Sequence, residues 1–333
     1  MDYINFKKTY EYKEVIEQTN AVASNPLVTV CVQTYQHSKF IEECLDSILM
    51  QKTNFDFEIN LGEDASTDGT REICIEYAKK FPNKIRLFLH HRENNIAIDG
   101  SPTGRFVLLT NLFSSRGKYI ALCEGDDYWT DPYKLQKQVD FLENNPDFVL
   151  THHDAKIVNE NGDILNNSKL PKKYGKDYSA AELKKGPFLL TLSLCFRNKL
   201  KKYPAEMFEC LNGDKWLISL LGDYGKAKYL PEIDSAAYRT HPGGIWSLHK
   251  NVSKHYNLFN TFTQLGIYYN KKGEIDLVYF FNKRSRNEMY KVLQYYRHQN
   301  NYRKFMENLK FYYKSSKDSI WIKNKTILRS LLK

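Results

Sequence analysis

Hydrophobic residues in the first part of the chain follow two alternating patterns. One pattern is a short apolar run rich in β-branched or aromatic residues, which is typical of a buried strand. Such runs occupy 27–35, 57–64, 85–90 and 118–124. The segments between them place apolar residues at helical spacing, for example Ile73, Tyr77 and Phe81 at i, i+4 and i+8. Strands that alternate with helices predict an α/β fold with a mixed, mostly parallel sheet flanked by helices.

The first helix of this series is predicted over 38–51. Its apolar residues share one face, and Ser38 is a suitable N-cap. Two further helices are expected near 73–81 and 106–113. A last helix of the α/β part is expected over 134–145, directly after the acidic and aromatic stretch that ends the fourth strand.

The second half of the chain has weaker patterns. A hairpin is predicted at 152–164 and a short helix at 214–222. Beyond residue 250 the sequence has helical spacing, many tyrosines and an excess of basic residues. We therefore expect an N-terminal extension, one α/β domain and a helical basic C-terminal extension, with the bounds 1–24, 25–250 and 251–333.

Composition narrows the class of protein. With 333 residues, 42% of them hydrophobic, the chain has enough apolar material for a sizeable globular core. It contains no apolar run of about 20 residues that could span a bilayer, and its start lacks the apolar core of a signal peptide. The six cysteines form no CxxC pair. Buried free thiols in a reducing cytoplasm are the expectation.

The net charge of +10 is unevenly distributed. Residues 251–333 contain 17 Lys and Arg against 5 Asp and Glu, a surplus of +12, whereas residues 1–250 are close to balance. Basic clusters with aromatic neighbours gain free energy at an anionic membrane surface, about 1 kcal/mol per Lys or Arg. Peripheral contact with the inner face of the membrane is therefore one hypothesis for this region. A solvated helical appendage and a homodimer contact are the alternatives.

Acidic residues follow two of the predicted strands. Asp64 ends the strand at 57–64, and Glu124, Asp126 and Asp127 follow the strand at 118–124. In sheets of this kind, ligands bind beyond the carboxyl ends of the strands. Like charges held close together are costly unless a cation neutralises them, and carboxylates are ligands for Mg²⁺ or Mn²⁺ bridged to phosphates. The cluster therefore predicts a divalent metal site.

Ordinary structural interpretations compete with this one. A pair of aspartates before a helix is often a solvated turn, and the Ser, Thr, Asp and Gly of 64–70 are typical of a turn and an N-cap. Asp68 and Gly69 are assigned only that role, while Asp64 is expected to accept hydrogen bonds from a nucleotide base. The chain has neither a P-loop nor a GxGxxG motif. A nucleotide would thus depend on a metal to offset its diphosphate charge.

Four segments together resemble the family-2 inverting glycosyltransferases with the GT-A fold, of the type that builds bacterial polysaccharides. They are VTVCVQTYQHSKFIEECLDSILMQ (28–51), GEDASTDGT (62–70), GKYIALCEGDDYWTDPYKLQKQVDFLE (117–143) and YRTHPGGIWS (238–247). The resemblance covers residues 25–250. It implies a nucleotide-sugar donor, often UDP-linked, and a divalent metal, Mn²⁺ or Mg²⁺.

The resemblance also implies roles for individual residues. The donor is expected to contact Thr34, Tyr35, Asp64, Arg105, Glu124, Asp126, Asp127 and Trp246. Within this set, Glu124 takes the first acidic place of the family's D-x-D motif and Asp126 takes the second, which binds the metal. His241 resembles a loop residue that adds a metal ligand.

Asp214 occupies the place of the family's catalytic base, although Gly213 replaces the acid that usually precedes it. The implied reaction is a single displacement that inverts the anomeric carbon. Asp214 would take the proton of the acceptor hydroxyl, and the metal would offset the charge of the departing diphosphate. The implied acceptor is a glycan or a lipid-linked saccharide.

Two other classes of function remain as alternatives. A sugar nucleotidyltransferase also combines acidic residues, a metal and a parallel sheet, but it should carry a Gly-rich basic loop after the first strand, where this chain has QTYQHSKF. A non-catalytic protein that binds a nucleotide sugar, or a nucleic acid through the basic region, is the other alternative. Nucleic acid is not the expected partner.

Overall fold

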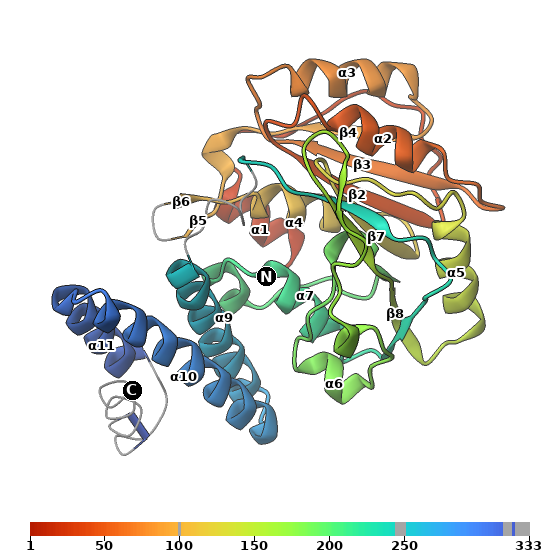
Figure 1. The fold of residues 1–333 in the computed structure, drawn as a ribbon. Coiled ribbons are helices and arrows are strands. Elements are labelled where there is room, and N and C mark those ends of the chain that lie inside the picture. The colour runs from red at the N-terminus through yellow and green to blue at the C-terminus, as the bar shows by residue number, and fades with distance from the viewer. Residues whose placement is uncertain (99–100, 244–250, 316–321, 324–333) are drawn as a thin grey trace. The chain divides into compact units, whose positions relative to one another are not determined.

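The structure, a computed structural model, describes residues 1–98, 101–243, 251–315 and 322–323 (Figure 1). The chain divides into two compact units. The first comprises Met1–Tyr203 and Leu217–His241, and the second comprises Pro204–Trp216 and Pro242–Lys333. Residues 1–24 thus belong to the first unit, and the second unit includes the segment 204–216 as well as the C-terminal helices.

An eight-stranded sheet forms the centre of the first unit. Its strands in spatial order are β1 (Ile16–Glu17), β4 (Ile85–Leu89), β3 (Phe57–Glu63), β2 (Val28–Thr34), β7 (Tyr119–Glu124), β11 (Cys195–Arg197), β8 (Phe148–His152) and β12 (Lys226–Tyr229). The four central strands β4, β3, β2 and β7 are parallel, whereas β1 and β11 pair antiparallel to their neighbours. The four strands predicted from apolar runs and the mixed, mostly parallel sheet are confirmed.

Helices cover both faces of this sheet. Figure 1 shows α2 (Ile41–Leu49) and α3 (Thr70–Lys80) on one face, and α1 (Tyr3–Tyr10) and α4 (Arg105–Ser114) on the other. Apolar residues of α2, α5 (Lys134–Asn144), β2 and β3 belong to one continuous core. Burial of these apolar side chains is the main stabilising contribution to the first unit.

The predicted N-cap of the first helix was wrong. The residue at the N-cap of α2 is Phe40, and Ser38 lies before the helix. The backbone N–H of Ser38 donates instead to Asp68, 3.0 Å away. The segment before α2 is therefore fixed by the neighbouring loop and enters the helix later than its sequence suggests.

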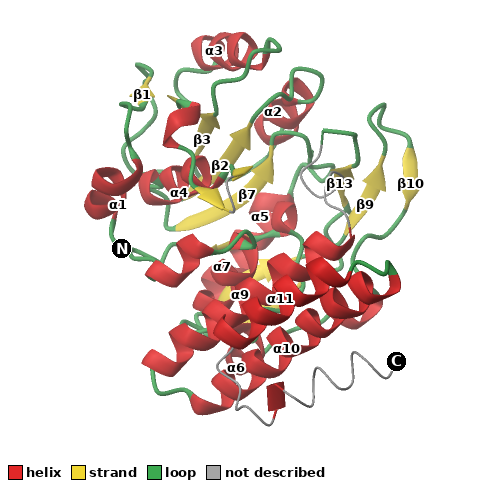
Figure 2. Ribbon diagram, turned by 90° about the vertical axis from the view of Figure 1, so that its left-hand side faces the viewer, coloured by secondary structure: helices red, strands yellow, loops and turns green. Residues whose placement is uncertain are grey.

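Two smaller sheets complete the strands of the first unit. The predicted hairpin is confirmed as β9 (Ala155–Val158) and β10 (Ile164–Asn166), and β13 (Ala236–Arg239) pairs parallel with β9. Figure 2 shows these three strands as a separate small sheet. The remaining short elements of this unit are β5 (Ala97–Ile98), β6 (Ser101–Pro102), α6 (Ala180–Lys184) and the 3-10 turns Arg92–Asn94, Lys172–Tyr174 and Thr191–Ser193.

The second unit is helical, as expected from its sequence. It contains a 3-10 turn (Ala205–Glu209), the first turn of α7 (Gly213–Leu221), and α9 (Asn251–Lys271), α10 (Ile275–His298) and α11 (Tyr302–Ser315). Phe259, Met289 and Tyr312, one from each of the three long helices, lie together in its core. Across the part of the chain that the structure describes, none of the helices combines the length and apolar character needed to cross a membrane.

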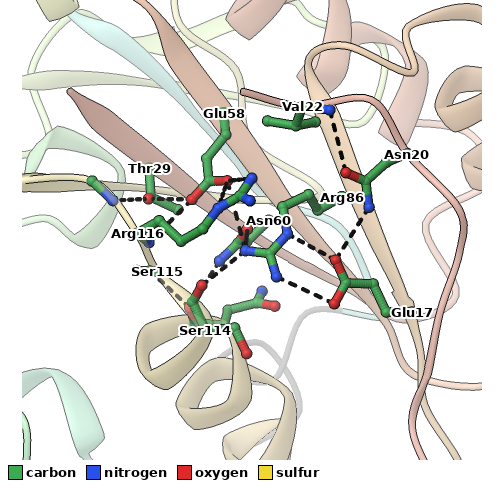
Figure 3. Close-up of polar contacts among 12 residues, drawn as sticks. Glu17, Asn20, Val22, Thr29, Glu58, Asn60, Arg86, Ser114, Ser115 and Arg116 are labelled. Carbon is green, nitrogen blue, oxygen red and sulfur yellow. Dashed lines mark hydrogen bonds and ion pairs between the residues drawn. The ribbon is translucent and has the colours of Figure 1, made fainter. Parts of the chain in front are cut away.

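A buried network of charged groups lies near the amino ends of the central strands (Figure 3). Glu58, which is fully buried on β3, accepts hydrogen bonds from Thr29 on β2 and from the guanidinium of Arg116. Arg86 on β4 lies 3.6 Å from the same carboxylate and also donates to Glu17. The network ties five segments together at the end of the sheet opposite to the predicted site.

All six cysteines are buried, as predicted, and no disulfide joins any two of them. Sγ of Cys44 on α2 donates a hydrogen bond to Sγ of Cys123 on β7, 3.9 Å away, and no disulfide joins the two residues. They act as small apolar side chains in the core beneath the acidic turn.

Candidate active site

Three parallel strands end at one edge of the sheet and bring the predicted site residues of the first unit together. Thr34 at the end of β2 pairs with Glu63 on β3, and Gln33 pairs with Glu124 on β7. Asp64, Thr34 and the acidic turn at 124–127 therefore lie on neighbouring strand ends. The expectation that both acidic motifs meet at the carboxyl edge is confirmed.

The acidic turn packs tightly against the end of β2. The N–H of Gly125 donates to the carbonyl of Gln33, 3.0 Å away. A Cβ atom at Gly125 would approach both Cβ and Oγ1 of Thr34 to 2.7 Å, which is closer than such atoms tolerate. Glycine at this position thus allows the turn to present its acidic residues directly beside the first strand.

Asp126 is the centre of a cluster with two histidines. Its Oδ2 lies 3.1 Å from Nε2 of His241 and 3.9 Å from Nε2 of His37. One ligand atom of each residue falls within 4.8 Å of the others. The side chain of Asp126 remains 21% exposed, so the cluster is open to a ligand. The sequence predicted Asp126 and His241 for this site but missed His37.

His37 is held in place by a rigid loop between β2 and α2. Gln36 has a left-handed backbone with φ 55°, and its N–H donates to Ser66. The N–H of His37 donates to Oγ1 of Thr70, 2.8 Å away. On the ring, Nδ1 lies 3.2 Å from Oγ1 of Thr34, which leaves Nε2 directed to Asp126. Burial lowers the pKa of His37 and favours the neutral imidazole that binds metals.

Asp127 has a different environment from Asp126. Its carboxylate is buried and accepts a hydrogen bond from the backbone N–H of Arg239, 2.8 Å away. Burial raises the pKa of Asp127, and the nearby charges of Asp126 and Glu124 act in the same direction. In Asp126, burial is the largest effect and opposes ionisation, but the hydrogen bond to His241 and the charges of His37 and His241 together outweigh it, and the pKa is lowered. The predicted donor contact of Asp127 stays a prediction.

A second group of polar residues surrounds Asp64. Its carboxylate forms an ion pair with Arg92 and accepts hydrogen bonds of 2.9 and 3.1 Å from the amide of Asn95. The guanidinium of Arg92 stacks on the ring of Tyr35, 3.9 Å from its centroid. Burial raises the pKa of Asp64 to about 6, although Asn95 and Arg92 oppose this. An aromatic face beside a carboxylate and a guanidinium is suited to a nucleobase.

Lys169 and Tyr238 lie beside the acidic turn, and the sequence gave no signal for either. The Nζ of Lys169 stands 3.4 Å from the centroid of the Tyr238 ring. Burial raises the pKa of Tyr238, and the charges of Asp127, Asp126 and Glu124 add to this effect. The charge of Lys169 interacts with that of Asp127, and a lysine beside the acidic turn is a candidate contact for a phosphate.

The remaining predicted residues are placed as follows. Arg105 is buried at the first position of α4, and the carbonyl of Glu124 accepts hydrogen bonds from Cys44 and Asp127. Asp214 lies in the first turn of α7, in the part of that helix that belongs to the second unit. Trp246 lies outside the described residues. The structure does not test the roles of these residues.

The side chains around Asp126 suit the divalent metal that the sequence predicts. Two imidazole nitrogens and one carboxylate oxygen within 4.8 Å form a donor set that suits a divalent transition metal. Two buried oxygens nearby, Oε1 of Gln33 on β2 and Oδ1 of Asn111 on α4, have no hydrogen-bond partner among the described residues. Because buried polar atoms are normally paired, these atoms indicate a polar ligand at the strand ends. The cluster fits a metal with a polar substrate.

Comparisons with known proteins identify a family and several relatives of this chain. Residues 29–203 match the family Glycosyl transferase family 2. An uncharacterized protein of Mycobacterium tuberculosis, Rv1520, is 35% identical over 215 residues, which cover 64% of this chain and 58% of that protein. An uncharacterized glycosyltransferase of Methanocaldococcus jannaschii, MJ1057, is 32% identical over 208 residues, covering 60% of this chain and 66% of its own. The matched region thus spans about three fifths of the length of these relatives.

The fold has a counterpart among solved structures. The mannosyltransferase PcManGT from Pyrobaculum calidifontis, solved in complex with GDP-Man and Mn²⁺, superposes with a TM-score of 0.50 at 14% sequence identity. The match covers 99% of this chain and 87% of that one. The predicted GT-A fold is therefore confirmed. With the family match covering more than half of the sequence, this chain belongs to glycosyl transferase family 2.

Proposed function

We propose that this protein is an inverting glycosyltransferase that moves a sugar from a nucleotide sugar to a hydroxyl group of a glycan or a lipid-linked saccharide. The proposed donor is a UDP-sugar. One observation carries the proposal. At the carboxyl ends of β2, β3 and β7, residues around Asp64 that suit a nucleobase lie on strand ends next to the residues around Asp126 that suit a metal-bound diphosphate. Family membership supports the same reaction class.

The base of the donor would bind at Tyr35 and Asp64. Tyr35 is 39% exposed, so its ring offers a free face for stacking. The Asp64 carboxylate can accept a hydrogen bond from the N–H of a uracil, and Arg92 can donate to a carbonyl oxygen of the base. Thr34, Glu124 and Arg105 would line the path from the base to the diphosphate.

The diphosphate would lie at the cluster of Asp126 and His241. These residues would hold a divalent metal, Mn²⁺ or Mg²⁺, which supplies a positive charge that offsets the developing charge of the leaving group. Lys169, whose charge interacts with that of Asp127, would add a second positive charge beside the acidic turn. Asp127 keeps the turn in place through the backbone of Arg239.

Asp214 would act as the general base. It would accept the proton of the acceptor hydroxyl while the oxygen attacks the anomeric carbon from the face opposite to the diphosphate. A single displacement of this kind inverts the configuration at the anomeric carbon and needs no protein nucleophile. The buried cysteines are consistent with that requirement, since burial raises the pKa of Cys31 and of Cys195 to about 12 and keeps both as thiols.

The surface of the second unit supports contact with a membrane that carries a lipid-linked acceptor. Tyr279 on α10 and Tyr302 on α11 are 68% and 64% exposed, among a surplus of lysines and arginines. Exposed aromatic and basic side chains are typical of proteins bound to anionic bilayers. Sedimentation with phosphatidylglycerol vesicles, but not with phosphatidylcholine vesicles, is the expected result. A dimer in solution with no vesicle binding would contradict it.

The reaction is tested by screening UDP- and GDP-sugars for hydrolysis that depends on Mn²⁺. We expect release of free nucleotide from at least one sugar, and its loss in Asp126→Ala. Asp140→Ala, which removes another acid from α5, is the control and should keep the activity. If no nucleotide sugar binds in calorimetry with Mn²⁺ present, the proposed function is wrong.

A further inference from the structure

We propose that His37 is a third protein ligand of the metal, and that it makes the site select Mn²⁺ and similar transition metals over Mg²⁺. The inference rests on the proposed function, which requires a metal at Asp126. It adds His37 to the two metal ligands expected from the sequence, Asp126 and His241. The three ligands come from three separate places in the sequence: the loop before α2, the turn after β7 and the end of β13.

The distance from His37 to Asp126 fits two ligands of one ion better than a hydrogen bond, and the hydrogen-bonded pair of Asp126 and His241 is compatible with the same ion. The 3.9 Å between Nε2 of His37 and Oδ2 of Asp126 is too long for a hydrogen bond. Ligand atoms that each lie about 2.1 Å from a metal are about 3.0 Å apart at a right angle and about 3.5 Å apart in a tetrahedron. The 3.1 Å separation is close to the first value, and the 3.9 Å separation lies between the second value and the separation of about 4.2 Å for ligands on opposite sides of an ion.

Contacts behind each imidazole fix its orientation. Oγ1 of Thr34 is hydrogen-bonded to Nδ1 of His37. A hydrogen bond to the ring nitrogen that does not bind the metal is the usual way in which a protein orients a histidine ligand. The ring of Phe40 lies 4.9 Å from that of His241, between centroids. These partners hold both Nε2 atoms near Asp126 before any metal binds.

The segment that carries His37 is fixed by hydrogen bonds from the loop after β3. Oε1 of Gln36 accepts from the N–H of Thr67, and Asp68 accepts from the N–H of Ser38. Asp68 also accepts a hydrogen bond from the hydroxyl of Thr70. That hydroxyl oxygen accepts a hydrogen bond from the backbone N–H of His37. The turn chemistry expected for Asp68 therefore has a specific consequence, since it positions a metal ligand.

The chemistry of the donor set determines which metal is preferred. Mg²⁺ binds almost entirely through oxygen and keeps several waters, whereas imidazole suits transition metals. One carboxylate alone would accept Mg²⁺ readily. Two imidazoles with one carboxylate favour Mn²⁺, Co²⁺ or Zn²⁺, and leave the other coordination positions to diphosphate oxygens and water.

The test is binding of the metal itself to the full-length chain, with and without UDP. We expect Mn²⁺ to bind at least tenfold more weakly to His37→Gln and His37→Ala than to the wild type, and the ratio of Mn²⁺ to Mg²⁺ affinity to fall by a similar factor. Pulsed EPR of bound Mn²⁺ should detect two coordinated imidazole nitrogens in the wild type and one in each variant. His255→Gln, which removes a histidine from the second unit, should leave both measurements unchanged.

The outcomes separate this inference from the proposed function. If both His37 variants are folded by circular dichroism and bind Mn²⁺ like the wild type, or if the wild type shows a single imidazole, His37 is not a ligand, while donor binding through Asp126 can still stand. If the wild type binds Mn²⁺ through two imidazoles but takes up no nucleotide sugar, the metal site stands and the proposed reaction fails. Lack of Mn²⁺ uptake by the wild type under both conditions overturns the inference.

Discussion

Nε2 of His241 lies 3.1 Å from Oδ2 of Asp126, although the two residues are 115 positions apart in the sequence. The contact joins the end of β13 in the small sheet to the turn after β7 in the large one. Arg239, two residues before His241, adds a hydrogen bond from its side chain to the carbonyl of Asp126. The candidate metal site thus depends on how two sheets of the first unit meet.

Replacement of Asp214 by asparagine tests the proposed base. We expect kcat to fall by roughly 10²–10⁴, because the proton of the acceptor then has no basic partner. The Kd for the nucleotide sugar and for Mn²⁺ should stay unchanged. Asp276→Asn, a first-turn aspartate of α10 in the same unit, is the matched control. Wild-type kcat in Asp214→Asn would exclude this residue as the base.

Recognition of the base should depend on pH through Asp64. Its pKa of about 6 means that the carboxylate is mostly ionised at pH 7 and mostly protonated at pH 5. Because a hydrogen bond from uracil N–H requires the ionised acceptor, affinity should fall by about tenfold between pH 7 and pH 5.

Uridine without metal is the suitable ligand for this measurement, since it does not involve the histidines near Asp126. Titration by NMR would give the Kd at each pH. The Asp64→Asn variant should bind more weakly at pH 7 and show little change with pH. An unchanged affinity of the wild type at pH 5 would contradict the role of Asp64.

The network around Glu58 should contribute to stability and not to catalysis (Figure 3). Removing Glu58 leaves Arg116, Arg86 and Thr29 without their shared acceptor in the core. Breaking a buried ion pair costs about 3–5 kcal/mol, and the partial exposure of Arg116 places the expected loss for Glu58→Ala near the lower end.

Urea unfolding would measure this loss. Glu143→Ala removes an exposed partner of Lys118 and should cost less than about 1 kcal/mol. Donor binding by Glu58→Ala at low temperature, where the variant remains folded, should match the wild type. If Glu58→Ala and Glu143→Ala had the same free energy of unfolding, the buried network would contribute no more to stability than an exposed ion pair.

A second prediction about stability concerns Lys134. It is almost fully buried, with Nζ 4.0 Å from the centroid of the Trp129 ring and hydrogen-bonded to Gln138. Burial lowers its pKa to about 8 from the ordinary value of 10.5. Between these two values the unfolded chain binds more protons than the folded one, so this group makes the protein more stable as the pH rises.

Lys134→Met removes that dependence. The free energy of unfolding of the variant minus that of the wild type should fall by about 1–3 kcal/mol between pH 7 and pH 10. Unfolding in urea at the two pH values measures the difference. Lys79→Met, which removes an exposed lysine from α3, is the control. A constant difference for Lys134→Met would show that this lysine is not desolvated.

The central strands and the position of the acidic motifs could be predicted because local sequence determines them. Val28, Val30 and Val32 alternate through a strand that is buried on both faces, which gives an apolar run that is hard to mistake. Parallel strands then place Asp64 and Asp126 at the same edge. These statements need only the order of strands and helices.

His37, Arg92 and Asn95 could not be found in the same way. Each occurs in a loop whose sequence resembles many solvated loops, and each becomes meaningful only through a contact with a distant residue, Asp126 or Asp64. The N-cap at Ser38 failed for the same reason, since Asp68 from another loop takes its N–H. Tertiary hydrogen bonds overrode a preference that acts only over a few residues.

The loop after β2 carries Tyr35, which stacks with Arg92 beside Asp64, and His37, which lies near Asp126, two residues apart on a segment that hydrogen bonds to Ser66 and Thr70 fix. Any adjustment that widened the nucleobase end to admit a purine would therefore also displace an imidazole at the other end. If the donor and the metal bind as proposed, the preference for nucleotide and the preference for ion would be linked, and variants selected for a new donor should need compensating changes in the 66–70 segment.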